Sequence, residues 1–211
     1  KSLALVETRK LARILPCQRA MLDNIESALA DFLPFWPTVA EPQPAVSVLV
    51  AIGAERGFCG SFDERLVRAW RAWPEAQRPA VVLAVGERLI ARLSGEPKVQ
   101  ARIEGATSAE DIPAVLNRLV DALRSVSVVA RGPVTLVCLA HDAQGIPASI
   151  ELLPFRGPSA APRTQAPQTN LAPARLLAAM LDQYLPAALL GQLYTSLAAE
   201  SHQRLAHLDN A

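Results

Sequence analysis

Apolar residues recur with helical spacing at both ends of this chain of 211 residues. In residues 4–33 they alternate in steps of four and three, which is the pattern of a helix that lies along another helix. In residues 189–211 a second stripe has the helical period of about 3.6 residues and continues to the last residue. We expect the two helices to pack together as an antiparallel coiled coil. The predicted seam consists of Leu11, Leu15, Leu22, Ile25 and Leu29 on the first helix and of Leu190, Leu193, Leu197, Leu205 and Leu208 on the second.

Prolines set the predicted limits of these helices. Pro16 falls inside the first stripe, and we expect it to bend that helix, because proline removes a backbone hydrogen bond and clashes with the preceding turn. The proline-rich stretch 34–44 is predicted to end the helix and to serve as a connector. Pro173 suits the first turn of a helix. We expect Pro186 to separate a helix at 175–184 from the long terminal helix.

Between these ends the pattern changes to strands that alternate with helices. Such alternation predicts an α/β domain, Rossmann-like, with a mainly parallel sheet. The polar strand at 98–103 is expected at an edge of the sheet. Two helix starts have the spacing of a capping box, Ser61 with Glu64 and Ser108 with Asp111. Strands are predicted at 46–52, 80–85, 98–103, 134–140 and 148–153, and helices at 62–73, 87–93 and 109–126.

Four segments follow from these patterns. Residues 1–33 are predicted to form the N-terminal coiled-coil helix, and residues 46–155 the Rossmann-like α/β domain. Residues 156–172 are rich in proline, alanine, serine and threonine and read as a linker. Residues 173–211 are predicted to form C-terminal helices, the last of which pairs with the N-terminal helix.

Composition excludes several classes of protein. Although 51% of the residues are hydrophobic, no apolar run reaches the roughly 18 residues of a membrane-spanning helix. No secretory signal is visible, so a soluble protein, or a soluble part of one, is expected. The formal net charge of +1 gives no electrostatic reason to expect nucleic acid as a partner. The three cysteines lie in unrelated segments, which suits free thiols in the cytoplasm.

The most site-like segment is the glycine loop, residues 53–61, between the first predicted strand and a helix. Phosphates bind at such places, because free N–H groups and the helix dipole point at the ligand. The glycines of this loop, however, match neither the dinucleotide fingerprint nor the P-loop. Glycines that only shape a tight turn are the simpler interpretation. A small-molecule or nucleotide-binding module that uses this loop is therefore the alternative hypothesis.

The sequence gives little support for a catalytic site or a metal site. Cys59 precedes a helix and follows Arg56, a setting that favours the thiolate, and His141 is the candidate base for a Cys-dependent enzyme. That interpretation ranks last. His202 and His207 are five residues apart on one helix and offer no metal-binding spacing with cysteines or carboxylates. We therefore predict no catalytic residue, no metal site and no cofactor.

Two segments resemble the gamma subunit of F-type ATP synthases. The sequence Arg56-Gly-Phe-Cys-Gly60 is similar to that family's Asp-Arg-Gly-Leu-Cys-Gly-Gly loop, with Glu55, Phe58 and Ser61 as replacements. The stretch 196–211 is similar to the family's signature Ser-Leu-Ala-Ser-Glu-His-Ala-Ala-Arg-Met-x-Ala-Met-x-Asn-Ala. Together with the order helix, α/β domain, helix, the resemblance covers nearly the whole chain. The matching positions are Arg56, Gly57, Phe58, Cys59 and Gly60 in the loop and Glu200, Arg204, Asn210 and Ala211 in the helix.

The resemblance implies a rotor shaft without catalytic groups. In that family the α/β domain binds no nucleotide, and the end helices form an antiparallel coiled coil that turns inside a ring of alternating alpha and beta subunits. The loop would lie near the lower part of the beta subunits, and the α/β domain would meet the epsilon subunit and the membrane c-ring. The chain would then transmit torque at the cytoplasmic face of a bacterial inner membrane, with no transmembrane segment of its own.

Some residues depart from the family pattern. Family members have longer helices at both ends, including the part that reaches into the catalytic head. Pro16 in the first helix and Ser201 in place of the usual histidine are further departures. A truncated or divergent bacterial gamma subunit is therefore expected.

Overall fold

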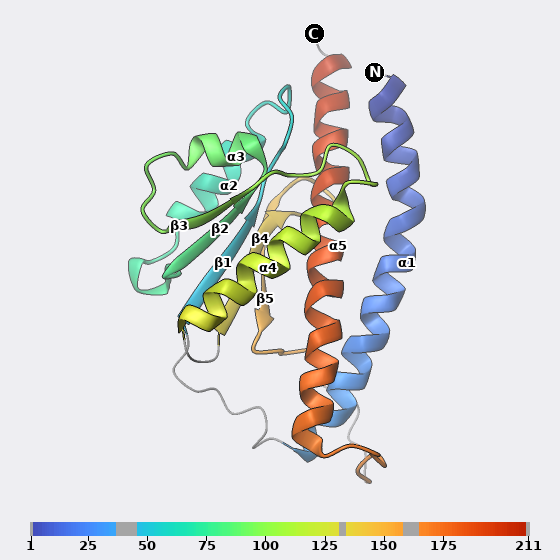
Figure 1. Cartoon of the computed structure of the whole chain (residues 1–211). Helices are drawn as coiled ribbons and strands as arrows, with labels where there is room; N and C mark the ends of the chain where they lie inside the picture. Colours follow the sequence, from blue (N-terminus) through green and yellow to red (C-terminus); the bar gives the residue numbers. More distant parts are fainter. Residues whose placement is uncertain (1, 37–45, 131–133, 158–164, 210–211) are drawn as a thin grey trace.

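The computed structural model describes residues 2–36, 46–130, 134–157 and 165–209. A long helix stands at each end of this order, with alternating strands and helices between them (Figure 1). The helices are α1 (Ser2–Phe32), α2 (Phe62–Arg71), α3 (Glu87–Arg92), α4 (Ile112–Ala130) and α5 (Pro173–Asp209), with short 3-10 turns at Leu33–Phe35 and Glu75–Gln77. The strands are β1 (Val46–Ile52), β2 (Val81–Val85), β3 (Val99–Ile103), β4 (Val134–His141) and β5 (Pro147–Leu153).

The strands form one five-stranded sheet with the order β3-β2-β1-β4-β5. Strands β1 to β4 are parallel, and β5 pairs antiparallel with β4. The prediction of a mainly parallel sheet with the polar strand at its edge is therefore confirmed. The apolar β1 and β2 lie inside the sheet, where side chains on both faces are buried.

Helices cover both faces of the sheet. Alternate side chains of β1 point to opposite faces, as the strand period requires. Val48 and Val50 join the core under α1, α4 and α5, whereas Leu49 and Ala51 pack against α2 and α3. The fold is thus a three-layer α/β arrangement in which the two end helices belong to one outer layer.

The end helices run antiparallel and side by side, with both chain ends at the top of Figure 1. Their apolar stripes share one core with the sheet. Most of the predicted seam is buried or packed against that core, while Leu205 is half-buried outside it and the side chain of Leu208 is outside the described part. The buried seam residues are Leu11, Leu29, Leu193 and Leu197, and those half-buried against the core are Leu15, Leu22, Ile25 and Leu190.

The expectation that Pro186 divides the C-terminal segment is wrong. α5 is continuous from Pro173 to Asp209, with Pro186 inside it. The missing amide of Pro186 leaves the carbonyl of Asp182 without its helical partner, but Asp182 is exposed, so water can take that place. Pro16 likewise lies inside a continuous α1, four residues after the exposed Ala12.

Of the two predicted capping boxes, Ser61 with Glu64 lacks its capping bond, whereas Ser108 and Asp111 do pair, ahead of the first turn of α4. Ser61 is the N-cap of α2, but its side chain makes no capping hydrogen bond. The acidic Asp63 and Glu64 of the first turn complement the helix dipole instead. Before α4, Asp111 Oδ2 accepts hydrogen bonds from the Thr107 and Ser108 amides at 3.0 and 2.9 Å, so the chain turns there and α4 begins three residues later than predicted.

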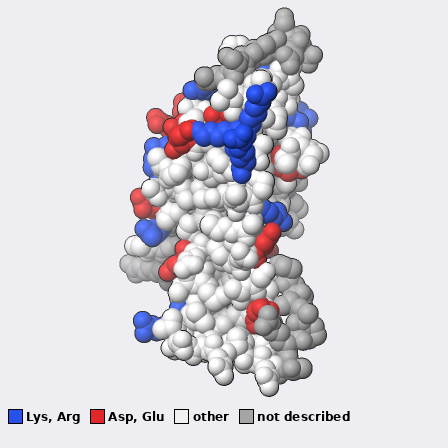
Figure 2. Space-filling view, turned by 90° about the vertical axis from the view of Figure 1, so that its right-hand side faces the viewer, with Lys and Arg blue, Asp and Glu red and all other residues white. Residues whose placement is uncertain are grey.

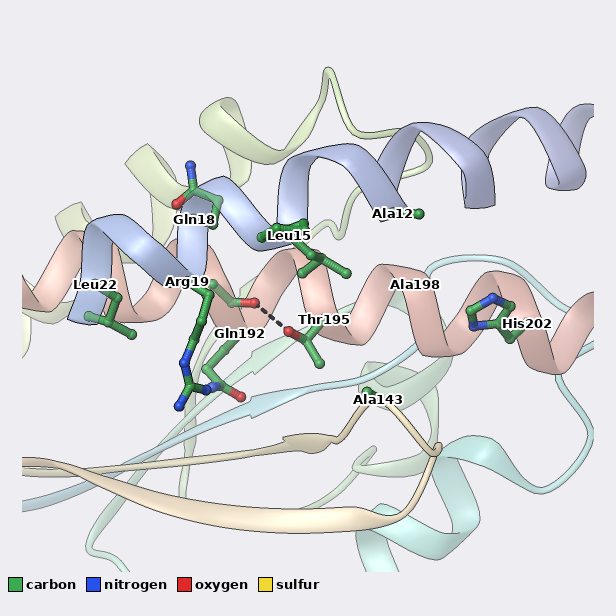
Figure 3. A pocket seen from close by; sticks show the side chains of 12 residues that line it. Ala12, Leu15, Gln18, Arg19, Leu22, Ala143, Gln192, Thr195, Ala198 and His202 are labelled. Carbon is green, nitrogen blue, oxygen red and sulfur yellow. Dashed lines mark hydrogen bonds between the residues drawn. The ribbon is translucent and has the colours of Figure 1, made fainter. Parts of the chain in front are cut away.

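A groove runs between α1, α5 and the turn after β4 (Figure 3). Its volume is about 420 Å³, and Ala12, Gly191 and Ala198 leave room for it because their side chains are small or absent. α5 is also the one helix of the described residues that is apolar and long enough to cross a membrane by length and composition. A core helix meets the same criterion, and α5 packs against α1, α4 and β4.

Candidate functional site

The glycine loop lies at the carboxyl end of the sheet. It follows β1, whose neighbours are β2 on one side and β4 on the other. The chain leaves β1 toward β2 and later crosses back to β4, so the crevice between β1 and β4 is the switch point where open α/β sheets bind ligands. This is the place where the alternative hypothesis would put a phosphate.

In this chain α5 fills the crevice. Ala199 of α5 forms a buried cluster with Ala54, Cys59 and Phe62. His141, at the end of β4, stacks on Phe62 with 3.5 Å between the ring centroids. The space above β1 and β4 is therefore occupied by the chain's own side chains.

Carboxylates of the chain itself accept hydrogen bonds from the amides of the loop. Asp63 Oδ1 accepts a hydrogen bond from the Ala54 amide at 2.8 Å. The two oxygens of Glu200 accept hydrogen bonds from the amides of Glu55 and Arg56, both at 3.3 Å. Three successive N–H groups that would face an anion are thus paired internally, which speaks against a phosphate site.

Glu200 is buried, with 3% of its surface exposed, and pairs with Arg204 one turn further along α5. Arg204 Nε also donates to the Gly57 carbonyl at 3.4 Å, and Nη2 lies 3.9 Å from Cys59 Sγ. We call these contacts of Glu200 and Arg204 with residues 55–59 the loop clasp. The clasp joins the two segments that carry the family resemblance, although 145 residues separate Glu55 from Glu200.

The remaining predicted site residues lie around the clasp. Arg56 and Phe58 point outward, and Phe58 is 75% exposed with a positive φ of 67°. A left-handed backbone is strained for phenylalanine, so the surrounding contacts hold it there. Gly60 also has a positive φ, and His207 of α5 lies against it. Asn210 and Ala211 lie outside the described residues.

Comparisons with known proteins agree with this arrangement. A family model described as ATP synthase matches residues 1–211. The chain belongs to the gamma family of ATP synthases. No match was found among curated proteins.

Solved structures supply the fold of this gamma-family chain. A chain from the central stalk and c-ring of the Tetrahymena thermophila mitochondrial ATP synthase is 17% identical, with 99% of this chain and 98% of that chain covered and a TM-score of 0.62. A rotor chain of the Euglena gracilis mitochondrial ATP synthase is 13% identical, with coverages of 99% and 87% and a TM-score of 0.48. This chain of the gamma family therefore shares its fold with a chain of an ATP synthase central stalk.

Sequence reasoning missed the contacts that two carboxylates make around the gamma chain's glycine loop. Asp63 is buried beneath the loop, and a Cβ atom on Gly53 would lie 2.4 Å from its Oδ1. Glu55 turns the other way and accepts hydrogen bonds from the amides of Glu87 and Gly105, at 3.0 and 2.6 Å. Acidic residues near a helix start are common, so no sequence signal marked Asp63, and the family motif placed Glu55 in the loop without indicating which amides it contacts. Within the described ranges, no group of three or more His, Cys, Asp and Glu could hold a metal ion.

The environment of Cys59 is opposite to the one expected. Burial, and next the charge of Glu200, raise the pKa of the thiol to about 11. Burial, and next the charge of Arg65, lower the pKa of His141 to about 4. A thiolate–imidazolium pair needs the reverse of both shifts, so this gamma chain offers no support for a Cys-dependent enzyme.

Thiol labelling checks this assignment. In the native chain we expect Cys59 to react with a disulfide reagent at pH 8 at least about tenfold more slowly than the exposed Cys17, because Cys59 is buried and protonated. Mass spectrometry of labelled peptides measures both rates, and denaturation in urea should make them similar. Equal rates in the folded chain would contradict the assignment.

Because the pKa of Glu200 is raised, we expect the free energy of unfolding to depend on pH. Its burial outweighs the attraction of Arg204 and raises its pKa from 4.5 to about 7. The folded state therefore holds this proton more tightly than the unfolded state between those values. Its stabilising contribution is fully present below pH 4.5 and is lost as the pH rises through 7, by about 2–3 kcal/mol.

The Glu200→Gln variant isolates this contribution, because glutamine has no charge to titrate. Urea unfolding at pH 5, 6, 7 and 8 gives the free energy of unfolding of both proteins. We expect the wild-type value to fall relative to that of the variant as the pH rises, while other titrating groups cancel in the difference. Parallel curves would rule out the raised pKa of Glu200.

Proposed function

We propose that this gamma-family chain is the rotor shaft of an F-type ATP synthase and transmits torque between the membrane ring and the catalytic head. The observation that carries the proposal is the loop clasp, within a chain that matches the family over its whole length. A shaft must pass torque from one part of the molecule to another without slipping. The buried clasp fixes α5 to the α/β domain, while α1 lies along α5 on its other side.

In this proposal the chain has no catalytic group of its own, and ATP chemistry belongs to the partner subunits. The amides of the glycine loop are paired with carboxylates, and the pKa values of Cys59 and His141 are shifted away from reactivity. These features favour a mechanical role over the alternative of a nucleotide-binding module. Calorimetry with ATP, NAD and phosphate is expected to show no micromolar binding.

The proposed contact with the catalytic head is the loop Arg56 to Gly60, next to the signature residues Glu200 and Arg204 and, further on, Asn210 and Ala211. The clasp holds the inner side of the loop, so Phe58 is presented outward on a fixed backbone. An exposed aromatic side chain on a rigid support is typical of an interface anchor. The proposed partners are the alpha and beta subunits at the shaft and the epsilon subunit and c-ring at the α/β domain.

The surface on the α1 side agrees with a shaft enclosed by partners. Figure 2 shows that Lys, Arg, Asp and Glu are sparse over the middle of this face. α1 also carries exposed apolar side chains, among them Val6 and Met21, which a partner could cover. We propose that the complex lies at the cytoplasmic face of a bacterial inner membrane, where the α1–α5 pair acts as a coiled-coil shaft and ion transport drives the ring.

Reconstitution tests the proposed function. The full chain is mixed with the alpha and beta subunits of a gamma-depleted bacterial ATP synthase, and assembly and ATPase activity are measured. We expect ATPase activity to be restored. Failure of the chain to assemble with the alpha and beta subunits would contradict the proposal. Phe58→Ala should weaken assembly, whereas Ile150→Ala, an exposed apolar change on β5, serves as the matched control.

A further inference from the structure

A second hollow lies on the face of the sheet that α2 and α3 cover, and two of its lining residues, Glu64 and Arg92, also border the glycine loop. It has a volume of about 370 Å³ and lies between α2 and α3. Arg68 and Arg71 of α2 and Arg92 of α3 line it, together with Val67 and Glu64. Three guanidinium groups from two helices therefore surround one surface depression.

These positive charges are only partly compensated. Glu64 pairs with Arg92 at 2.7 Å. Arg68 and Arg71 are exposed and make no ion pair within the part of the chain that the structure describes. Since the whole chain carries a net charge of only +1, the charge here is a local concentration and not a general property of the surface.

A further arginine is held beside the hollow by backbone contacts. Arg78 Nη2 donates to the Arg71 carbonyl at 2.7 Å, and Nε donates to the Trp73 carbonyl at 3.2 Å. These bonds fix its guanidinium at the end of α2 without neutralising it. Arg78 therefore adds a positive charge next to the Arg71 backbone, at the C-terminal end of α2.

We propose that this hollow docks an acidic segment of a partner protein. Guanidinium groups bind carboxylates through paired hydrogen bonds. Arg68 and Arg71 are three residues apart on one helix, so their Cβ atoms lie about 5–6 Å apart and the charges form a row. A row of cations fits successive carboxylates of a peptide better than one compact anion. Among the described residues, Val67 is the sole apolar one that lines the hollow and none that lines it is aromatic, so a nucleotide base finds no ring there to stack on.

Fluorescence anisotropy with a fluorescein-labelled hexaglutamate peptide and the full chain tests the proposal. We expect binding at 20 mM NaCl that weakens at 150 mM NaCl. The variant Arg68→Glu/Arg71→Glu should bind the peptide at least tenfold more weakly. The control Arg9→Glu/Arg13→Glu makes the same charge change on exposed residues of α1 and should weaken binding less than twofold.

Three outcomes would overturn the proposal. They are absence of peptide binding at low salt, equal weakening in both variants, and binding of pyrophosphate without binding of the peptide. Urea unfolding of each variant shows whether it is folded, and Arg68→Gln/Arg71→Gln gives a milder second variant if charge reversal disturbs α2. Because the assay uses the isolated chain, its result is independent of reconstitution with alpha and beta subunits.

Discussion

The Glu200→Ala variant is expected to lower the free energy of unfolding at pH 7 by about 3 kcal/mol or more, because it removes a buried side chain that accepts hydrogen bonds from the loop and from Arg204. Arg204, whose side chain is 14% exposed, would keep its charge without a partner. The amides of Glu55 and Arg56 would also lose their acceptor. Urea denaturation followed by circular dichroism measures the change.

A surface pair supplies the control for this experiment. Glu151 and Arg156 form an ion pair at 3.4 Å, with their side chains 41% and 72% exposed. Glu151→Ala should therefore cost less than about 1 kcal/mol. If Glu200→Ala cost no more than this control, the loop clasp would not contribute to stability. Adding Arg204→Met to Glu200→Ala should recover part of the loss, since it removes the unpaired charge.

Gly86→Ala is expected to have the second large effect, a loss of about 3 kcal/mol or more in the free energy of unfolding. Gly86 precedes α3 with a φ of +101°. A Cβ atom there would lie 2.6 Å from the Gly53 carbonyl oxygen and 2.8 Å from that of Ala54. Both atoms belong to the backbone of the glycine loop, so relief of the clash must displace the loop.

The Gly95→Ala variant separates the cost of a left-handed backbone from the cost of a steric clash at the Cβ atom. Gly95 has a comparable φ of +83°, but nothing lies within 4 Å of the position of its Cβ atom. Only the left-handed conformation then opposes the substitution, at about 1–2 kcal/mol. Urea denaturation of the two variants gives the difference. Equal losses in the free energy of unfolding would mean that the loop moves away from the Cβ atom of Gly86→Ala at no cost.

Local patterns were enough to predict most of the fold. The apolar runs of β1 and β2 indicated buried strands, and the polar β3 indicated an edge, because burial on both faces of a strand requires apolar side chains on both. Local patterns failed to predict helix ends and caps where water or tertiary contacts determine them. Pro186 does not end α5, and Ser61 makes no cap although its spacing with Glu64 suits one.

The site was only half predictable. The resemblance named the loop and the positions of Glu200 and Arg204, but no local pattern links residues that lie 145 positions apart in the chain. The direction of the loop amides also depends on the backbone conformation around Phe58, which no residue type determines on its own. A glycine loop that binds a phosphate and one that binds its own carboxylates therefore look alike in sequence.

The pairing of α1 with α5 has a consequence for how the chain is made. Ribosomes synthesise α1 before α5, so the apolar face of α1 emerges before its main partner exists. Contacts between such distant segments form slowly, because a long loop must close before they can stabilise anything. We expect the nascent chain to expose Leu11 and Leu29 until α5 has been synthesised, which makes α1 a natural segment for a chaperone to protect.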